Sequence, residues 1–422
     1  MSITAVVGAQ WGDEGKGKIV DLLAQDAEIV VRYQGGANAG HTVVNNRGKF
    51  ALHLIPCGIF NPATVNIIGT GTVVDVDELI KEMDMLASSG IAMNNLKISE
   101  RAHMSLPIYP LLERQLENAR GVRKHGSTLR GISPAYAAKA LRIGVQMGEF
   151  RNPKRLSETL SELLTFGNQV LVNNFGATAL DVPETIGRFL SYAERVVPHL
   201  GDTLALLQDG MRNNCRILLE GQLGTMRDLD WGIYPYVTSS NPLPGGAAAG
   251  AGIPPHKITG VLGVVKAFST CVGAGPFPTE LHDDTGRYLR EVGQEFGATT
   301  GRPRRCGWLD AVALKYASML NGFTEIAVTK LDTLDGMETL KVCTGYLLDG
   351  ERIEHMPLAA DLFRAEPIYE EVPGWKEPTS GARSWNELPK ETQHYVELIE
   401  GYLGAKASII SVGPEREATF WK

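Results

Sequence analysis

Glycines and charged side chains are interleaved between Gly8 and Lys18, where the chain reads Gly-Ala-Gln-Trp-Gly-Asp-Glu-Gly-Lys-Gly-Lys. Glycines let backbone N–H groups point at an anion, and the first turn of a following helix adds positive potential. A glycine turn with only a structural role is the alternative. The lysines favour a nucleotide phosphate site, for which we predict contacts from Gly12, Glu14, Gly15, Lys16, Gly17 and Lys18.

This loop differs from an ordinary P-loop in two ways. The spacing from Gly12 to Lys18 fits G-x-x-x-x-G-K, but Ile19 stands where a P-loop has the Ser or Thr that binds Mg²⁺. Asp13 and Glu14 would repel phosphate unless a cation or a proton transfer required a carboxylate there. We therefore expect another group to hold the metal.

A second glycine-rich segment, residues 32–42, ends in Asn-Ala-Gly-His-Thr and also follows an expected strand. In an open parallel sheet, such loops gather at the carboxyl ends of the strands, so this segment should lie beside the first loop. His41 is then a candidate general acid, although a lone histidine is more often structural.

Two further segments predict recognition of nucleotide and of anions. Thr329-Lys-Leu-Asp332 follows an expected strand, and an aspartate there can accept hydrogen bonds from the N1–H and amino groups of guanine. Adenine would leave this carboxylate unpaired, which favours GTP over ATP. Residues 297–305 carry three arginines, whose forked guanidinium groups suit carboxylates and phosphates. A solvated basic loop is the alternative for that segment.

Short β-branched runs provide the elements that must position these loops. They cover residues 3–7, 28–31, 65–68, 216–219, 258–265, 325–328 and 408–412. Helical patterns lie between several of them, including residues 75–86 with acidic residues at the start. We predict an α/β fold with a large, mainly parallel sheet flanked by helices, a P-loop-like phosphate site and helical insertions. Residues 1–422 are expected to form one domain, with a helical insertion at about 149–209 and a packed loop at 245–252.

The overall composition narrows the class of protein. The net charge of −7 argues against a general nucleic-acid or anionic-membrane surface. The five cysteines are scattered without a C-x-x-C pair, so neither a disulfide framework nor a zinc cluster is indicated. No secretory signal or membrane span is visible, which makes a cytoplasmic enzyme the expectation.

Together these segments resemble the adenylosuccinate synthetase family over residues 3 to about 415. The resemblance depends on G-D-E-G-K-G-K, G-G-A-N-A-G-H-T, Y-P-Y-V-T-S-S-N (234–241), V-G-A-G-P-F-P-T-E (272–280), G-A-T-T-G-R, T-K-L-D and S-V-G-P (411–414). It implies a ligase of purine biosynthesis. In that family, O6 of IMP attacks the γ-phosphate of GTP, and L-aspartate then displaces the 6-phosphoryl group to give adenylosuccinate, GDP and phosphate.

The resemblance also assigns roles to residues. It implies that Asp13 is the base that takes the N1 proton, that His41 and Lys16 assist phosphoryl transfer, and that Asp13 and the Gly40 carbonyl hold Mg²⁺. Substrate contacts are implied for Asn38, Ala39, Thr128, Gln222, Thr238, Ala298, Thr299, Thr300, Gly301 and Arg302, and GTP contacts for Thr42, Arg304, Lys330, Leu331, Asp332, Ser411 and Gly413. Arg142 is expected to reach into the site of the partner subunit of a homodimer.

Two departures from the family pattern bear on the base pocket. Residues 220–224 read E-G-Q-L-G where the family has E-G-A-Q-G, so Leu223 stands in the place of the expected glutamine and Gln222 is displaced by one position. Neighbouring residues of an extended segment face opposite sides, so the two arrangements are not equivalent. Ser127 and Ser133 also differ from the residues that the family prefers.

Two alternatives stay open. One is a homologous ligase that acts on another purine nucleotide, such as GMP or dGMP. Retention of Asp13 argues against it, because this carboxylate suits the N1 proton of hypoxanthine. The other is a GTP-binding module without catalysis, for which the cationic segment and His41 would be superfluous.

Overall fold

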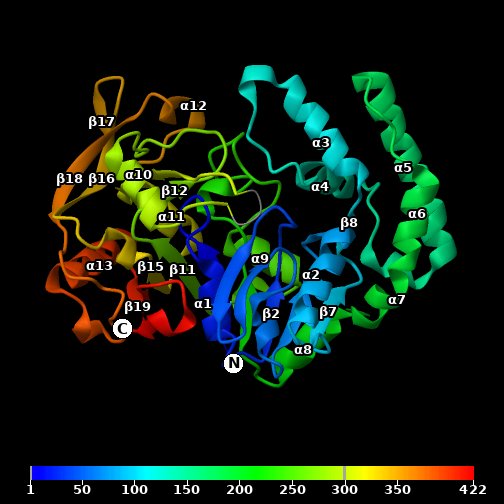
Figure 1. The fold of residues 1–422 in the computed structure, drawn as a ribbon, viewed down its shortest axis with the longest axis horizontal. Helices are drawn as coiled ribbons and strands as arrows, with labels where there is room; N and C mark the ends of the chain where they lie inside the picture. Colours follow the sequence, from blue (N-terminus) through cyan, green and yellow to red (C-terminus); the bar gives the residue numbers. More distant parts are fainter. Residues whose placement is uncertain (1, 298–300) are drawn as a thin grey trace.

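A ten-stranded sheet forms the centre of the molecule (Figure 1), seen in a computed structural model that describes residues 2–297 and 301–422. Every pairing in it is parallel except that of β20 with β19. All seven expected runs are strands of this sheet. Its order is β20 (Thr419–Trp421), β19 (Lys406–Ser411), β15 (Glu325–Thr329), β11 (Gly260–Lys266), β1 (Ile3–Gly8), β10 (Ile217–Glu220), β2 (Ile29–Arg32), β5 (Val65–Ile68), β7 (Leu96–Ser99) and β9 (Leu200–Gly201).

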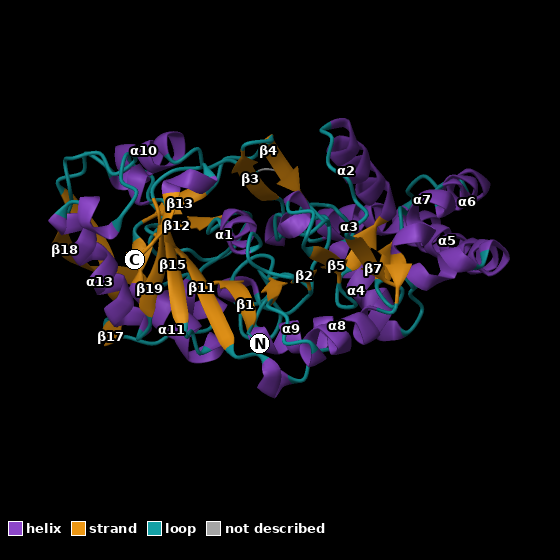
Figure 2. Cartoon of the chain, turned by 90° about the horizontal axis from the view of Figure 1, so that it is seen from below, coloured by secondary structure: helices purple, strands orange, loops and turns teal. Residues whose placement is uncertain are grey.

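Helices cover both faces of the sheet (Figure 2), so its strands are apolar on both sides. Side chains alternate along β1: Ile3, Ala5 and Val7 pack in one core, while Val6 packs in the other. The first core includes α8 (Thr203–Arg212), α9 (Pro244–Ala251), α11 (Ala311–Asn321) and α13 (Lys390–Leu403). The second includes α1 (Lys16–Leu23), α2 (Val76–Ser88), α3 (Ile108–Ala119) and α4 (Ile132–Leu141).

Several smaller sheets lie outside the ten-stranded sheet. Two-stranded pairs are β3 (His41–Asn45) with β4 (Gly48–Leu52), β6 (Val73–Asp75) with β8 (His103–Ser105), and β12 (Ser269–Cys271) with β13 (Arg305–Gly307). A separate sheet contains β14 (Leu309–Asp310), β16 (Thr339–Leu348), β17 (Glu351–Ile353) and β18 (Glu366–Pro373). The short helices α10 (Asp284–Val292) and α12 (Ala359–Leu362) lie on the same side of the molecule (Figure 1).

The segment expected as a helical insertion, 149–209, ends with β9 of the central sheet and most of α8, and before them has three helices that project together at one end of the molecule (Figure 1). They are α5 (Pro153–Phe175), α6 (Val182–Ser191) and α7 (Ala193–Val196). Whether they belong to a single domain with the sheet stays a prediction. No helix of the described residues is long and apolar enough to cross a membrane.

The prediction of a packed loop at residues 245–252 is wrong. Their glycines favour a loop, but α9 spans Pro244–Ala251. Pro244 occupies the first turn, where its missing N–H costs nothing, and Gly252 ends the helix at φ 75°. By contrast, the helix expected at 75–86 is α2, which Asp75 caps by accepting from Glu78 N–H at 3.0 Å.

Candidate active site

The loop between β1 and α1 has the backbone of an anion-binding site. Gly12, Asp13 and Gly15 have φ values of 102°, 62° and 93°, positive values that make the tight backbone turns typical of phosphate loops. Helix α1 begins at Lys16, so Lys16, Gly17 and Lys18 form its first turn. The local sequence therefore forms the predicted cradle, which lies at the carboxyl end of the strand in the middle of the sheet.

Glu14 stabilises this loop from within. Its buried carboxylate accepts from the N–H groups of Gln10 at 3.1 Å and Gly12 at 2.8 Å, and it forms an ion pair with Lys16 at 2.5 Å. The backbone carbonyl of Glu14 accepts from Thr329 Oγ1 at 2.6 Å. The side chain of Glu14 thus fixes the loop conformation, and its backbone carbonyl links the loop to the T-K-L-D segment.

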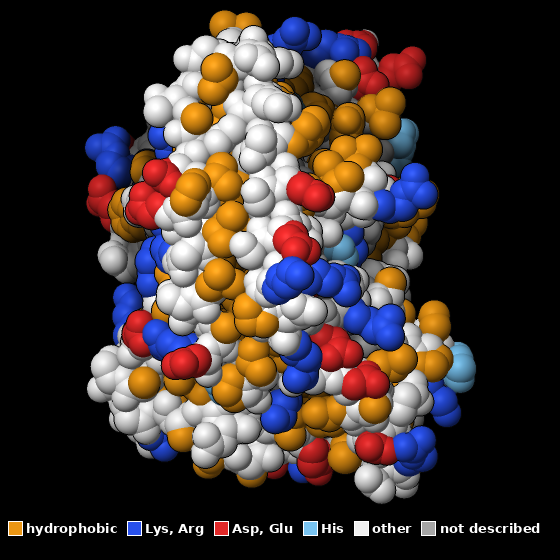
Figure 3. All heavy atoms as spheres, turned by 90° about the vertical axis from the view of Figure 1, so that its right-hand side faces the viewer, with side chains coloured by type: hydrophobic (Ala, Val, Ile, Leu, Met, Phe, Trp, Pro, Cys, Tyr) orange, Lys and Arg blue, Asp and Glu red, His pale blue; other side chains and the backbone are white. Residues whose placement is uncertain are grey.

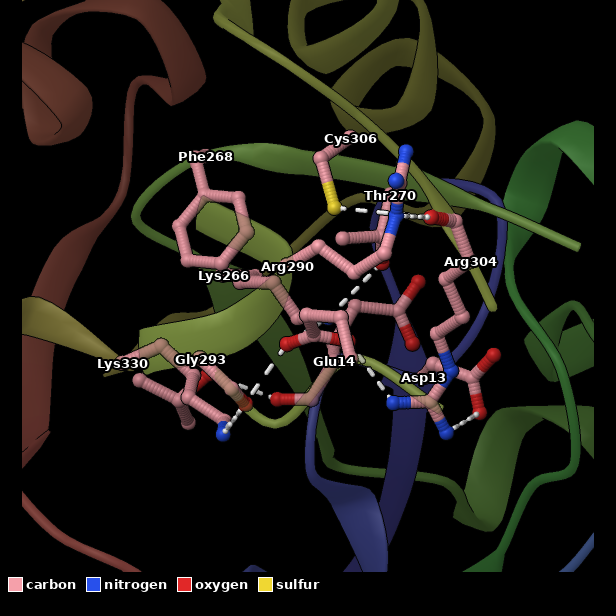
Figure 4. A network of polar contacts seen from close by, with 12 residues as sticks. Asp13, Glu14, Lys266, Phe268, Thr270, Arg290, Gly293, Arg304, Cys306 and Lys330 are labelled. Atoms are coloured by element: carbon pink, nitrogen blue, oxygen red, sulfur yellow. Dashed lines mark hydrogen bonds and ion pairs between the residues drawn. The ribbon is translucent and has the colours of Figure 1, made fainter. Parts of the chain in front are cut away.

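Asp13 points the other way, toward a network of cations (Figure 4). Arg304 Nη2 lies 3.0 Å from Asp13 Oδ1, and the same guanidinium contacts the buried Glu295 at 2.7 Å. Glu295 also pairs with the buried Lys266 at 3.0 Å. Burial alone would raise the pKa of Asp13, but Arg304, Lys266 and Lys16 more than offset it, and the pKa is lowered. Asp13 is therefore an ionised carboxylate surrounded by positive charge.

His41 lies beside this loop, at the start of β3. A Cβ on Gly17 would lie 2.7 Å from His41 Cβ, so only glycine permits this approach. His41 Nδ1 lies 2.5 Å from Glu220 Oε1. Burial and Arg32 lower the pKa of His41, although Glu220 opposes them. The hydrogen bond to Glu220 occupies Nδ1 and leaves Nε2 for a substrate.

Lys18 connects the phosphate loop to the carboxyl end of β19. Its Nζ donates to Ser411 Oγ and, at 2.5 Å, to the carbonyl oxygen of Gly413. Burial lowers the pKa of Lys18 to about 8. The negative charge of Asp332 raises the pKa of Lys18 against the effect of burial, so Asp332 lies near the Lys18 ammonium group.

The T-K-L-D segment places a carboxylate beside that contact. Asp332 lies in the short helix η7 (Leu331–Leu334), and its Oδ1 is buried without a hydrogen-bond partner among the described residues. Burial raises the pKa of Asp332 against the effect of Lys330 and Lys18. Lys330 donates to the carbonyl oxygen of Gly293 at 2.6 Å, and Leu331 is fully buried. An unpaired buried acceptor is expected where a ligand donates.

A cavity of about 670 Å³ extends from Asp13 toward the helices α3, α4 and α5. Predicted site residues that line it are Asp13, Asn38, Ala39, Gly40, Thr128 and Thr238. They come from segments that follow four different elements, and a volume of this size accommodates a nucleotide. Asn38 Oδ1 is buried without a hydrogen-bond partner among the described residues, as a group that contacts a ligand would be.

The predicted substrate contact of Gln222 is not supported. Its buried amide is used within the protein: Oε1 accepts from Gly36 N–H at 3.2 Å, while Nε2 donates to the carbonyl oxygens of Gly36 at 2.8 Å and His53 at 3.2 Å. Leu223, at φ 60°, lines the cavity beside Asp13 instead. The one-residue displacement therefore exchanges which side chain faces the cavity and which faces the loop behind it.

Several predicted residues lie away from this cavity or outside the described chain. Ala298, Thr299 and Thr300 lie outside the described residues, while Gly301 and Arg302 are exposed. Thr42 is exposed on β3, next to His41. Arg142 is exposed at the end of α4 and borders a second, smaller cavity, not the one that contains Asp13.

The two oxygen ligands that the resemblance implies for Mg²⁺ come from segments that line one cavity. The Asp13 carboxylate and the Gly40 segment line the same cavity, and carboxylate and carbonyl oxygens are donors that Mg²⁺ accepts. In the structure Arg304 supplies a positive charge at Asp13 Oδ1, which shows that the position favours a cation. These residues therefore fit the metal.

The sequence did not single out the buried charges behind the site. Glu220, Glu295 and Lys266 are each at most 1% exposed, and each contacts a predicted functional residue or its neighbour. Glu220 ends β10, and Lys266 ends β11, both at the carboxyl edge of the sheet. A charged residue at the carboxyl end of an otherwise apolar strand was the available signal.

Comparison with known proteins agrees with this geometry. The family model described as adenylosuccinate synthetase matches residues 5–420. Adenylosuccinate synthetases from Brevibacillus brevis and a Thermoanaerobacter species are 48% and 49% identical over 420 residues, covering 99% of this chain and 98% and 99% of theirs. A fully ligated adenylosuccinate synthetase from Plasmodium falciparum superposes with a TM-score of 0.94 at 38% identity, covering all of both chains.

A more distant solved structure shares the fold alone. The succinoaminodeoxyadenylate synthetase of cyanophage S-2L has a TM-score of 0.62 at 19% identity, covering 100% of this chain and 95% of that one.

Proposed function

The chain belongs to the adenylosuccinate synthetase family and is a GTP-dependent carbon–nitrogen ligase of purine nucleotide biosynthesis; we propose that Asp13, His41 and Lys16 carry its chemistry. The observation that supports this most strongly is the position of Asp13. It lies within the phosphate loop and also lines the adjoining cavity, so one carboxylate can contact both the acceptor base and the transferred phosphoryl group.

The first step transfers a phosphoryl group. The Asp13 carboxylate takes the N1 proton of IMP, O6 attacks the γ-phosphorus of GTP, and the bond to the GDP oxygen breaks. Lys16 and the loop N–H groups stabilise charge on the phosphates. His41 presents Nε2 to the transferred group, whose negative charge favours the protonated imidazole. Asp13 and the Gly40 carbonyl would hold Mg²⁺, which would neutralise phosphate charge.

The second step makes the carbon–nitrogen bond. The amino group of L-aspartate attacks C6, the C6–O6 bond breaks, phosphate leaves with the O6 atom, and the attacking nitrogen releases one proton to the solvent. The arginine-rich segment supplies the counter-charge for the aspartate carboxylates. Asn38, Thr128 and Thr238 contact IMP, and Asp332, Lys330, Ser411 and Gly413 surround the guanine of GTP.

A homodimer completes the site in this proposal. Arg142 is exposed and borders a different cavity from that of Asp13, as expected of a residue that serves a neighbouring copy. Figure 3 views the face that carries α5 and α6 and shows apolar side chains among the charged ones. Exposed apolar residues of α3, α4 and α5 include Leu116, Leu141, Phe166 and Val172. A second copy covering this region would bury them.

Omitting one substrate at a time tests the reaction. Phosphate release from GTP should require both IMP and L-aspartate, and GMP or dGMP should not replace IMP. Undiminished release without L-aspartate would contradict the ligase reaction. A preference for GMP or dGMP would keep the reaction type and change the acceptor, an outcome to which Leu223 in the cavity gives a physical basis.

A further inference from the structure

Arg227 joins two walls of the cavity that contains Asp13. It ends the short helix η5 (Thr225–Arg227) and is 8% exposed. Its Nη1 donates to the carbonyl oxygen of Tyr236, and its Nη2 donates to the carbonyl oxygen of Val272 at 2.5 Å and contacts Cys271 Sγ at 3.0 Å. One rigid guanidinium fork therefore fixes the distance between two segments that are far apart in sequence.

The backbone of Arg227 holds the first wall as well. Thr238 N–H donates to the carbonyl oxygen of Arg227 at 2.9 Å. Arg227 is therefore hydrogen-bonded to this turn twice, to Tyr236 through its side chain and to Thr238 through its main chain. Both of these residues line the cavity, and Thr238 is a proposed IMP contact.

The second wall extends this effect to the segment that holds Thr128. Ala274 N–H donates to the carbonyl oxygen of His125 at 3.2 Å. A Cβ on Gly126 would lie 3.0 Å from Ala274 N and 3.1 Å from Gly273 Cα, so the two segments are in close contact. A shift at Val272 would therefore move the backbone that leads to Thr128.

A second arginine, Arg305, forms hydrogen bonds at the far end of the wall at Val272–Gly273, so the role of Arg227 is separate. Arg305 donates to the carbonyl oxygens of Gly273 at 3.3 Å and Gly275 at 2.9 Å, while Glu280 neutralises it through a contact at 2.8 Å. These contacts keep the turn at 273–275 folded without Arg227. Gly275, to which Arg305 donates, packs against Tyr236, since a Cβ on Gly275 would lie 2.8 Å from Tyr236 Cβ; the hydrogen bonds of Arg227 join this same wall to Val272.

We infer that Arg227 is a positioning residue for the purine nucleotide acceptor: it sets the spacing between the walls at Tyr236–Thr238 and Val272–Gly273, against which IMP binds. This inference rests on the proposed function, because it takes Thr128 and Thr238 as acceptor contacts. The GTP motifs lie on other segments, at Lys18, Asp332 and Ser411. Arg227 should therefore affect the acceptor and not the phosphoryl donor.

Steady-state kinetics of Arg227→Met and Arg227→Lys test this role. Arg227→Met removes the fork while keeping a long side chain, and loss of hydrogen bonds from a charged group should raise KM for IMP about 10-fold or more. KM for GTP should change less than about 2-fold, a small free-energy difference, because the hydrogen bonds of Arg227 described above lie outside the GTP segments. Arg227→Lys should recover part of the affinity for IMP. The matched control, Arg212→Met, alters an exposed arginine of α8 and should leave both constants unchanged.

Three results would overturn the inference. One is an unchanged KM for IMP in folded Arg227→Met, and another is an equal rise of KM for IMP and for GTP, which indicates a general structural role. If Arg227→Met does not fold, Arg227→Lys is measured in its place. An unchanged KM for IMP in folded Arg227→Lys is then the third result that would overturn the inference.

Calorimetric titration of IMP into each protein, without GTP or L-aspartate, separates this inference from the proposed reaction. Weaker IMP binding by the Arg227 variants than by the parent supports the positioning role even if the parent fails to release phosphate. Equal binding by parent and variants contradicts it.

Discussion

Asp13 combines two environments that are rarely found together at one residue. It has a left-handed backbone within the phosphate loop, and its carboxylate is 30% exposed toward the cavity while Arg304 contacts it. An ionised carboxylate in that position can accept a proton from a neutral purine ring only if the base lies against it. The role of Asp13 is therefore a geometric claim that a single substitution can test.

Asp13→Ala should abolish turnover and retain GTP binding. Removing a general base typically costs about 10² to 10⁴ in rate, and here the same change also removes a proposed metal ligand. Phosphate release measures the turnover, and calorimetry measures the affinity for GTP. Asp26→Ala, an exposed aspartate just beyond α1, is the control and should behave like the parent. Substantial activity in Asp13→Ala would refute the base assignment.

Asp332→Asn should weaken the discrimination between GTP and ITP, which lacks the 2-amino group of guanine. The carboxylate that would accept from that amino group is buried and unpaired among the described residues, and a hydrogen bond to a charged group contributes enough for about a 10-fold effect. The ratio of kcat/KM for the two nucleotides measures it. An unaltered ratio would place the guanine elsewhere.

Functional residues could be predicted from the sequence where their neighbours in the chain provide the setting. Asp13, Lys16 and Asp332 each stand in a short motif whose backbone folds locally: Asp13 lines the cavity, Lys16 begins α1 and pairs with Glu14, and Asp332 lies in η7. Their functional roles stay predictions. Glu295 and Arg227 could not be found this way. Their roles depend on contacts that no short motif contains: Glu295 pairs with Lys266, 29 residues away, and Arg227 donates to Val272, 45 residues away.

At the scale of elements, continuous β-branched runs bounded by turns predicted seven of the ten strands of the sheet, because a strand covered on both faces is apolar on both. The helix α9 was missed because its glycines and alanines lack the polar face that marks an amphipathic helix. Its boundary signals, Pro244 and Gly252, were present in the sequence. Gln222 and Leu223 show more clearly what the sequence pattern does not predict. The positive φ of Leu223 decides which of these two side chains faces the cavity.

The amino end of α11 provides a test of how burial shifts a charge. Asp310 caps this helix by accepting from Ala313 N–H at 3.0 Å, and Tyr346 donates to its other oxygen at 2.7 Å. Burial raises the pKa of Asp310 to about 6. Its contribution to stability is then fully present below the unfolded pKa near 4 and is lost as the pH rises through 6.

Asp310→Asn should remove this pH dependence while keeping a capping oxygen. Between pH 4 and pH 7 the parent should lose up to about 3 kcal/mol of unfolding free energy relative to the variant. Denaturant unfolding of both proteins across this range measures the difference. A constant difference across the range would mean that Asp310 titrates normally.

At the scale of the whole molecule, the proposed site needs a second copy of the chain. Arg142→Met should be nearly inactive alone, because the partner subunit's Arg142 would no longer reach the acceptor. Asp13→Ala is inactive for a different reason. Mixing the two variants under conditions of subunit exchange should restore activity, because hybrid dimers contain one site with both residues intact.

Random exchange sets the expected recovery at about one quarter of the parent activity, from half of the molecules carrying one intact site of two. The controls are each variant mixed with itself, which should stay inactive. No recovery in a mixture that sedimentation shows to be dimeric would place Arg142 outside the shared site.

Transfer of an oxygen atom tests the central claim most directly. IMP labelled with ¹⁸O at position 6 is incubated with GTP, L-aspartate and the enzyme, and the released phosphate is analysed by ³¹P NMR or mass spectrometry. If Asp13 drives O6 onto the γ-phosphorus, each phosphate should carry one ¹⁸O atom. Unlabelled phosphate, formed while the nucleotide turns over, would show that water or aspartate attacks without a 6-phosphoryl intermediate and would contradict the account.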